Sequence, residues 1–183
     1  YYVVDSIKDS NGKEIYKHQS QPVQVFSKAT SSIMAELLKG PIKSQKTTTF
    51  YGQLSNLNPT LAGADWVGKT GTSNDFVDVW LLVGTPTVTL SSWVGHDNNT
   101  PMAAMTGYNN NSQYLAQMAN SIYQANPGVC GVAQRFSLDP SVTKSTVLAL
   151  TGEKPGAFTG GSYTNFTLSG PTSTSYWAKP EGA

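Results

Sequence analysis

The chain has 183 residues, a formal net charge of +1 at pH 7, and 38% hydrophobic against 13% charged residues. Its length predicts one domain, with or without a small additional module. Its near-neutral charge gives no electrostatic case for binding nucleic acid. The single cysteine excludes an internal disulfide, and the two histidines and scattered carboxylates show no metal-ligand spacing. We therefore expect neither a metal nor another cofactor.

The first third of the chain predicts a hairpin and a helix. Strand-favouring residues on both sides of Asn11-Gly12 predict a small antiparallel element within residues 1–26. Apolar residues that share one face predict a helix over residues 27–39, with Gly40-Pro41 as its stop signal. The polar, threonine-rich residues 42–59 predict a long loop.

Three strands and a second helix are expected in the middle of the chain. The strands are predicted over residues 66–73, 76–84 and 88–95. Because the connections between them are short, they predict an antiparallel meander. Apolar residues on one side of residues 112–124 predict the second helix.

The composition shifts to Ser, Thr, Gly and Pro in the last quarter of the chain, where short strands are predicted at residues 145–150 and 163–168. We therefore divide the chain into residues 1–134, which hold the meander and both helices, and residues 135–183. The second part is predicted to be a small β module or an extended tail.

The most informative motif is Lys69-Thr70-Gly71-Thr72, on the first strand of the predicted meander. Acyl transfer on a peptide carboxylate needs a fixed positive charge, hydroxyl donors, and an exposed backbone N–H for the oxyanion. Lys69 supplies the charge. Thr70 and Thr72 lie two residues apart, so a strand aims both hydroxyls to the same side. Gly71 allows a substrate backbone to approach closely, and the N–H of Thr72 can point at a developing oxyanion.

Other side chains near the motif are interpreted structurally. Asp75 and Asp78 flank the turn after the motif strand, and we expect them to hold the shape of the cleft. Trp66, Trp80 and Trp93 fall on or beside the meander strands, where we expect aromatic residues of the core or of the rim of the site. Contact between Trp80 and a substrate peptide is the alternative.

The motif belongs to a longer pattern, made of Gly68-Lys69-Thr70-Gly71-Thr72-Ser73-Asn74-Asp75, Asp78-Val79-Trp80 and Trp93-Val94-Gly95-His96-Asp97-Asn98-Asn99-Thr100-Pro101-Met102. This pattern resembles the transpeptidase domain of class A penicillin-binding proteins, bifunctional enzymes of bacterial cell-wall synthesis. The likeness is nearest to the 1b type of Gram-positive cocci and covers residues 27–127. The implied fold is α+β, the C-terminal half of the penicillin-recognising fold of serine β-lactamases and transpeptidases, with an antiparallel sheet packed with helices.

The resemblance also implies a role for each motif residue. Lys69 would contact the serine of a Ser-x-Asn motif and keep the cleft electropositive. Thr70 and Thr72 would hold the terminal carboxylate of a D-Ala-D-Ala stem peptide or of a β-lactam, and the N–H of Thr72 would form half of the oxyanion hole. The catalytic residues are then Lys69 and Thr72, and the substrate-binding residues are Thr70, Gly71, Thr72, Ser73 and Asn74.

The serine nucleophile that the resemblance requires is missing from the expected place. Ser-x-x-Lys occurs at Ser10/Lys13, in the predicted hairpin turn, and at Ser141/Lys144, in the polar tail, and Ser-x-Asn does not occur. We expect an upstream segment to carry both motifs. Either the protein has been cleaved in a loop and the two pieces stay associated, or the upstream part simply lies outside this sequence. We favour cleavage, because an isolated piece would expose a large apolar face to water.

The resemblance implies a serine-type D,D-transpeptidase, catalytically incomplete in this chain alone, that cross-links peptidoglycan stem peptides and is inhibited by β-lactam antibiotics. It implies a location at the extracytoplasmic face of the cell membrane, with the anchor in an N-terminal region outside this sequence. Two alternatives stay open. One is a serine β-lactamase, which shares Lys-Thr-Gly. The other is a non-catalytic extracellular β-rich module in which the motif is incidental.

Overall fold

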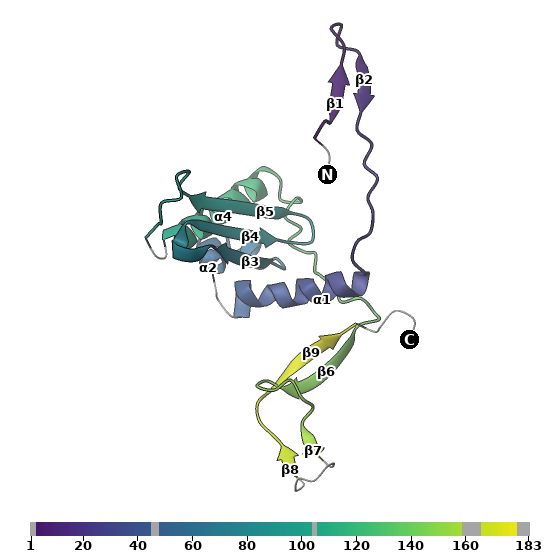
Figure 1. Cartoon of the computed structure of the whole chain (residues 1–183), viewed down its shortest axis with the longest axis vertical. Coiled ribbons are helices and arrows are strands. Elements are labelled where there is room, and N and C mark those ends of the chain that lie inside the picture. Colours follow the sequence, from purple (N-terminus) through teal and green to yellow (C-terminus); the bar gives the residue numbers. More distant parts are fainter. Residues whose placement is uncertain (1–2, 45–47, 104–105, 159–165, 179–183) are drawn as a thin grey trace.

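The structure is a computed structural model that describes residues 3–44, 48–103, 106–158 and 166–178. Its central body is a three-stranded sheet with helices packed against it (Figure 1). An N-terminal hairpin extends from this body in one direction, and the C-terminal strands extend in the other (Figure 1). The body is thus of the mixed α+β class that the sequence predicts.

The sheet consists of β3 (Val67–Thr72), β4 (Asp78–Gly84) and β5 (Thr89–Gly95), antiparallel and in that order. The predicted meander is therefore confirmed. Alternate residues of β4 are buried and roughly half exposed, as in a sheet with one covered face. Because β4 lies between its two partners, β3 is an edge strand of the sheet that the described residues form.

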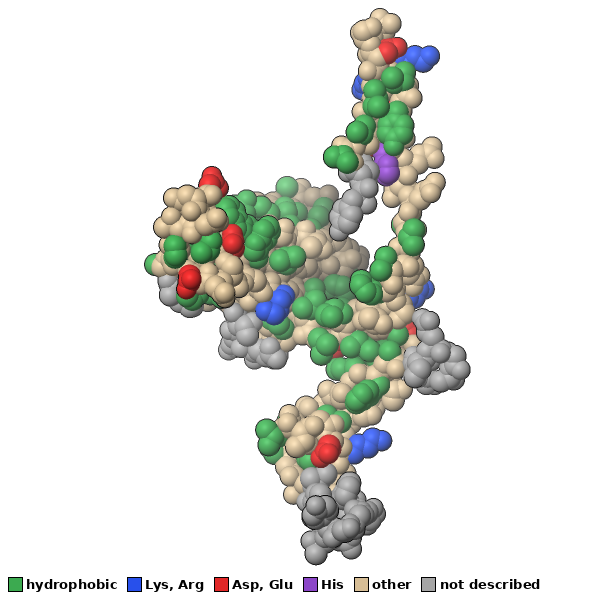
Figure 2. Space-filling view, viewed as in Figure 1, with side chains coloured by type: hydrophobic (Ala, Val, Ile, Leu, Met, Phe, Trp, Pro, Cys, Tyr) green, Lys and Arg blue, Asp and Glu red, His purple; other side chains and the backbone are tan. Residues whose placement is uncertain are grey.

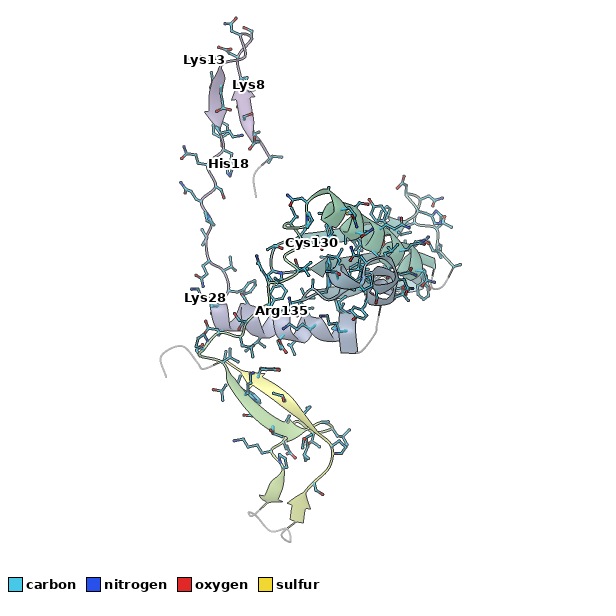
Figure 3. The ribbon with its side chains drawn as sticks, turned by 180° about the vertical axis from the view of Figure 1, so that it is seen from behind. Lys8, Lys13, His18, Lys28, Cys130 and Arg135 are labelled. Atoms are coloured by element: carbon cyan, nitrogen blue, oxygen red, sulfur yellow. The ribbon has the colours of Figure 1, made fainter. Side chains whose placement is uncertain are left out.

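Two helices cover one face of the sheet, α2 (Phe50–Leu57) and α4 (Thr106–Ala125), as the view from behind shows (Figure 3). The largest core side chain is Trp66, whose indole N–H donates to the carbonyl oxygen of Leu61 at 2.9 Å. The Phe50 ring meets Trp66 edge-on, with ring centroids 5.1 Å apart. The expectation that Trp66 is a core residue is confirmed.

The first helix, α1 (Lys28–Lys39), matches its prediction, and the hydroxyl of Ser27 caps it by accepting a hydrogen bond from the backbone N–H of Thr30 at 3.1 Å. The α-helix ends at Lys39 with Gly40 as its C-cap, so the predicted stop is confirmed, although the chain then continues in a π-helical turn, Gly40–Ser44. This turn carries Ile42 into the core, where the side chain is fully buried. Burial of Ile42 thus keeps the chain coiled beyond the glycine and the proline.

The loop predicted over residues 42–59 is wrong in its second half, which is helical. Phe50 and Leu54 lie one helical turn apart, and both are fully buried within α2. Asn58 then caps a short helix, α3 (Pro59–Ala62), by accepting a hydrogen bond from the N–H of Leu61 at 3.0 Å. The polar composition of this stretch reflects its exposed side, and two apolar residues at helical spacing determine its structure.

The N-terminal hairpin consists of β1 (Ser6–Lys8) and β2 (Glu14–Lys17), which confirms the antiparallel element. The carboxylate of Asp9 accepts hydrogen bonds from the N–H groups of Asn11 and Lys13, both at 2.9 Å, and Gly12 adopts a φ of 81° in the turn. The expectations for Tyr1 and Tyr2 lie outside the described residues.

In the C-terminal part, β6 (Thr143–Leu148) pairs with β9 (Thr172–Trp177), and β7 (Gly156–Phe158) pairs with β8 (Phe166–Leu168). The predicted strand at 145–150 falls on β6. That at 163–168 falls partly on β8 and partly outside the described residues. The phenol of Tyr176 donates to a carboxylate oxygen of Glu36 in α1 at 3.4 Å. The domain boundary at residue 135 stays a prediction.

Candidate active site

The motif lies on the edge strand β3, with Lys69 and Thr72 exposed and Thr70 half-buried. Thr70 pairs with Leu81 of β4, and Thr72 pairs with Val79. Residues directly opposite each other in an antiparallel pair project to the same face. Since Leu81 and Val79 are buried beneath the helices, both threonine side chains project to the face that α4 covers.

Lys69 and Gly71 project to the opposite, open face of the sheet, because they pair with the half-exposed Leu82 and Trp80. A Cβ atom placed on Gly71 would meet the Cβ of Trp80 at 3.4 Å, which is ordinary contact. The packing among the described residues therefore does not require glycine at this position. An absent side chain leaves that stretch of the strand open to an approaching backbone.

The backbone geometry of β3 directs the N–H of Thr72 outward. The N–H of Ser73 donates to the carbonyl oxygen of Asp78 at 3.0 Å, so Ser73 continues the ladder toward β4. Along an antiparallel strand, successive residues direct their backbone N–H and C=O groups to opposite sides. The N–H of Thr72, and that of Thr70 two residues before, therefore point to the free edge of β3.

The ammonium group of Lys69 lies at the same edge, where it donates to the carbonyl oxygen of Thr70 at 2.9 Å. Its distance from the Thr70 hydroxyl oxygen is 3.5 Å. None of the ion pairs formed within the described ranges includes Lys69. The free edge thus presents a positive charge and outward N–H groups, the combination that stabilises an anion.

The hydroxyl of Thr72 is hydrogen-bonded to the phenol of Tyr108, with the two oxygens 2.5 Å apart. Tyr108 lies in the first turns of α4, and its ring meets that of Phe76 edge-on at a centroid distance of 6.3 Å. Tyr108 is absent from the predicted site, because the apolar pattern predicts a helix that begins only at Ser112. The residues from Thr106 to Ser112 are polar and carry no periodic apolar signal that would have extended it.

Asp78 ties the turn after the motif to the far strand of the sheet. One of its carboxylate oxygens accepts a hydrogen bond from the indole N–H of Trp93 at 2.9 Å, and the other accepts one from the Ser73 hydroxyl at 3.2 Å. The backbone N–H of Asp78 donates back to the Ser73 hydroxyl at 2.8 Å. These bonds fix the chain directly after Thr72, the position at which the sequence analysis expected Asp78 to hold the shape of the site.

The start of β3 is fixed by a separate charge cluster. The carboxylate of Asp65, which is almost buried, lies 3.2 Å from the ammonium of Lys39 and accepts the N–H of Phe136 at 2.9 Å. Burial lowers the pKa of Lys39, but the hydrogen bonds to Glu36 and Asp65 and their negative charges together raise it by more, so its pKa lies above the ordinary 10.5. The cluster joins α1, the residue before Trp66 and the start of the C-terminal part.

The two Ser-x-x-Lys matches lie away from this site. Ser10 and Lys13 are in the tip of the N-terminal hairpin, far from the sheet (Figures 1 and 3). Ser141 precedes β6, and its hydroxyl donates to the carboxylate of Asp139 at 2.6 Å. Both matches thus lie outside the three-stranded sheet, one between β1 and β2 and the other at the start of β6 (Figure 1).

Within the described ranges, no group of three or more His, Cys, Asp or Glu side chains is placed to hold a metal ion. In the same part of the chain, every helix is too short or too polar to cross a bilayer.

No known family profile matches the chain. Penicillin-binding protein 4 of Bacillus subtilis is 33% identical over 99 residues, which are 54% of this chain and 14% of that protein. Penicillin-binding protein 1A of Rickettsia prowazekii is 26% identical over 167 residues, 83% of this chain and 21% of that protein. The chain is related to penicillin-binding proteins over part of their length.

A solved structure supports the fold. The chain matches the crystal structure of penicillin-binding protein 1A from Haemophilus influenzae with a TM-score of 0.55, at 15% sequence identity. The match covers 91% of this chain and 28% of that one. The mixed α+β arrangement described above is therefore found within part of a penicillin-binding protein.

Proposed function

We propose that this chain is part of a serine-type peptidoglycan D,D-transpeptidase and that the free edge of β3 binds its acyl donor. The observation that carries the proposal is the juxtaposition at this edge of the Lys69 ammonium with the outward N–H of Thr72. The relation to penicillin-binding proteins supports the same assignment. In the resulting site, Thr70 and Thr72 bind the terminal carboxylate of the donor, and Gly71, Ser73 and Asn74 line its path.

The reaction begins when a serine on an upstream segment attacks the carbonyl carbon of the penultimate D-Ala. The serine oxygen bonds to that carbon, the C–N bond to the terminal D-Ala breaks, and the serine proton ends on the departing amine. During attack the N–H of Thr72 donates to the carbonyl oxygen as it becomes negative. An amine of a neighbouring stem peptide then displaces the serine oxygen and forms the cross-link. A β-lactam acylates the same serine.

Exposed apolar side chains on the central body support the proposal that a further segment of the protein packs against it. Trp80, Leu82 and Trp93 on the open face of the sheet are 45%, 46% and 40% exposed, and Met34 and Leu37 of α1 are 53% and 58% exposed. Figure 2 shows hydrophobic side chains gathered over the sheet and along α1. An apolar surface of this kind is typical of an interface. In this proposal, the upstream segment that carries Ser-x-x-Lys and Ser-x-Asn covers this apolar surface.

In this proposal, residues 1–134 are the C-terminal part of a transpeptidase domain with the penicillin-recognising fold, and residues 135–183 are an appended β module. The whole protein lies in the cell envelope, as its relatives suggest. We place it at the extracytoplasmic face of the membrane, with its anchor outside this sequence. The 1b type and an origin in a Gram-positive coccus stay predictions.

The experiment is to incubate the complete protein with fluorescent penicillin, separate it on a denaturing gel, and measure the release of hydrolysed penicillin in parallel. A transpeptidase gives a stable covalent label. Rapid turnover without a lasting label would instead identify a serine β-lactamase. Neither label nor turnover would identify a non-catalytic β-rich module and overturn the proposal.

A further inference from the structure

The hydrogen bond between the Thr72 hydroxyl and Tyr108 affects how the Thr72 hydroxyl can bind an anion. A threonine hydroxyl has one hydrogen to donate and two lone pairs to accept with, and a carboxylate only accepts. To bind a carboxylate, Thr72 must therefore turn its single hydrogen toward the ligand. Its oxygen is then free to accept the hydrogen of Tyr108, whose phenol oxygen is 2.5 Å away.

We propose that Tyr108 is a positioning residue that donates to the Thr72 oxygen and so aims the Thr72 hydrogen at the carboxylate of the acyl donor. The inference rests on the proposed function. A phenol is the stronger donor of the two hydroxyls, because it is far more acidic than an aliphatic alcohol. A chain running from Tyr108 through Thr72 to the carboxylate aligns both hydroxyl dipoles, and each bond then strengthens the other.

The Tyr108 ring is itself held in place. The ring of Phe76 packs against it with an interplanar angle of 80°, an edge-to-face contact. Phe76 has a φ of 57°, which is unfavourable for an aromatic residue, and the preceding Asp75 has the same value. The carbonyl oxygen of Phe76 accepts a hydrogen bond from the N–H of Met102 at 3.2 Å, which helps to hold this strained backbone.

The strained backbone of Asp75 and Phe76 lies next to the proposed site. Backbone held in a rarely populated conformation clusters at functional sites, where the surrounding contacts enforce it. Here the strained turn begins at Asp75, three residues after the end of the motif strand, and the Phe76 ring packs against Tyr108. The turn therefore helps to hold the Tyr108 ring, and with it the phenol of the hydroxyl pair, in place.

The test uses the complete protein and two probes, a fluorescent penicillin with its free carboxylate and the methyl ester of the same compound. Tyr108→Phe keeps the ring but removes the hydroxyl. We expect it to slow acylation by the acid about tenfold, through weaker binding, with the limiting rate preserved. Acylation by the ester, which lacks the anion, should change less than about twofold.

Tyr114→Phe is the matched control, because Tyr114 lies on the same helix with its side chain exposed. It should leave both rates at the wild-type value. An equal loss with acid and ester in Tyr108→Phe would mean a merely structural tyrosine, and unchanged acylation by the acid would also overturn the inference. If the wild-type protein is acylated by neither probe, the proposed function fails first, and with it this inference.

Discussion

The ammonium group of Lys69 lies 2.9 Å from the carbonyl oxygen of Thr70, at the free edge of β3. Because the N–H of Thr72 points to the same edge, the strand offers a charge and a backbone donor to one ligand. This arrangement concentrates the proposed chemistry on four consecutive residues, Lys69 to Thr72, and each part can be removed separately.

Lys69→Ala removes the charge from the edge. We expect acylation by fluorescent penicillin to slow by about a hundredfold, since hydrogen bonds to charged groups contribute about 1.5–3 kcal/mol. The rate is measured by quenched labelling of the complete protein. Lys13→Ala, in the hairpin tip, removes a lysine distant from the sheet and should label at the wild-type rate (Figure 3). Equal labelling rates in the two variants would mean that Lys69 takes no part in the site.

Two substitutions of Thr72 separate its hydroxyl from its backbone N–H. Thr72→Ala removes the hydroxyl and the methyl group but keeps the backbone N–H, and we expect about a tenfold loss of acylation efficiency. Thr72→Pro also removes the N–H, and proline is tolerated on an edge strand where that group is unpaired. Its further loss should be about 100-fold, the effect of removing an oxyanion donor.

Labelling rates and circular dichroism of the complete protein check this comparison. The spectra establish whether the proline variant keeps the sheet. If Thr72→Pro is folded and is acylated as fast as Thr72→Ala, the N–H of Thr72 has no part in stabilising the oxyanion.

Asn111 joins α4 to the sheet in the core. Its fully buried side chain donates to the carbonyl oxygen of Val79 at 2.7 Å and accepts the hydroxyl of Ser92 at 2.8 Å. Asn111→Ala removes both of these core hydrogen bonds, so we expect the free energy of unfolding to fall by about 2 kcal/mol. Thermal unfolding of the complete protein measures it. The neighbouring, exposed Asn110→Ala should change stability by less than about 0.5 kcal/mol.

The raised pKa of Lys39 predicts a loss of stability in alkali. A lysine whose folded pKa lies above its unfolded value stabilises the fold fully below that unfolded value. This contribution disappears as the pH rises from about the ordinary 10.5 through the higher folded pKa. Unfolding free energies measured between about pH 9 and 12 should fall more steeply in the wild-type protein than in Lys39→Met.

The control for this titration is Lys28→Met, at the exposed start of the same helix, where no ion pair is found among the described residues. It should follow the wild-type curve. A Lys39→Met curve parallel to the wild type would mean that the cluster with Asp65 and Glu36 does not depend on the charge of Lys39.

Local patterns were sufficient to predict much of the body from sequence. Alternation along β4 and the short connections on either side predict the meander, and Ser27 with its apolar face predicts α1. The pattern failed at α2, where only Phe50 and Leu54 reveal a buried face. The contact of Tyr108 with Thr72 joins residues 36 positions apart, so it depends on how α4 crosses the sheet, and no local signal records it.

The location of the nucleophile can be found by labelling the complete protein with penicillin, digesting it, and identifying the acylated residue by mass spectrometry. We expect a modified serine in a Ser-x-x-Lys motif upstream of Tyr1, and no modification within these 183 residues. Modification of Ser10 or Ser141 would contradict this expectation, because the nucleophile would then belong to this chain and the division of the site between two segments would be wrong.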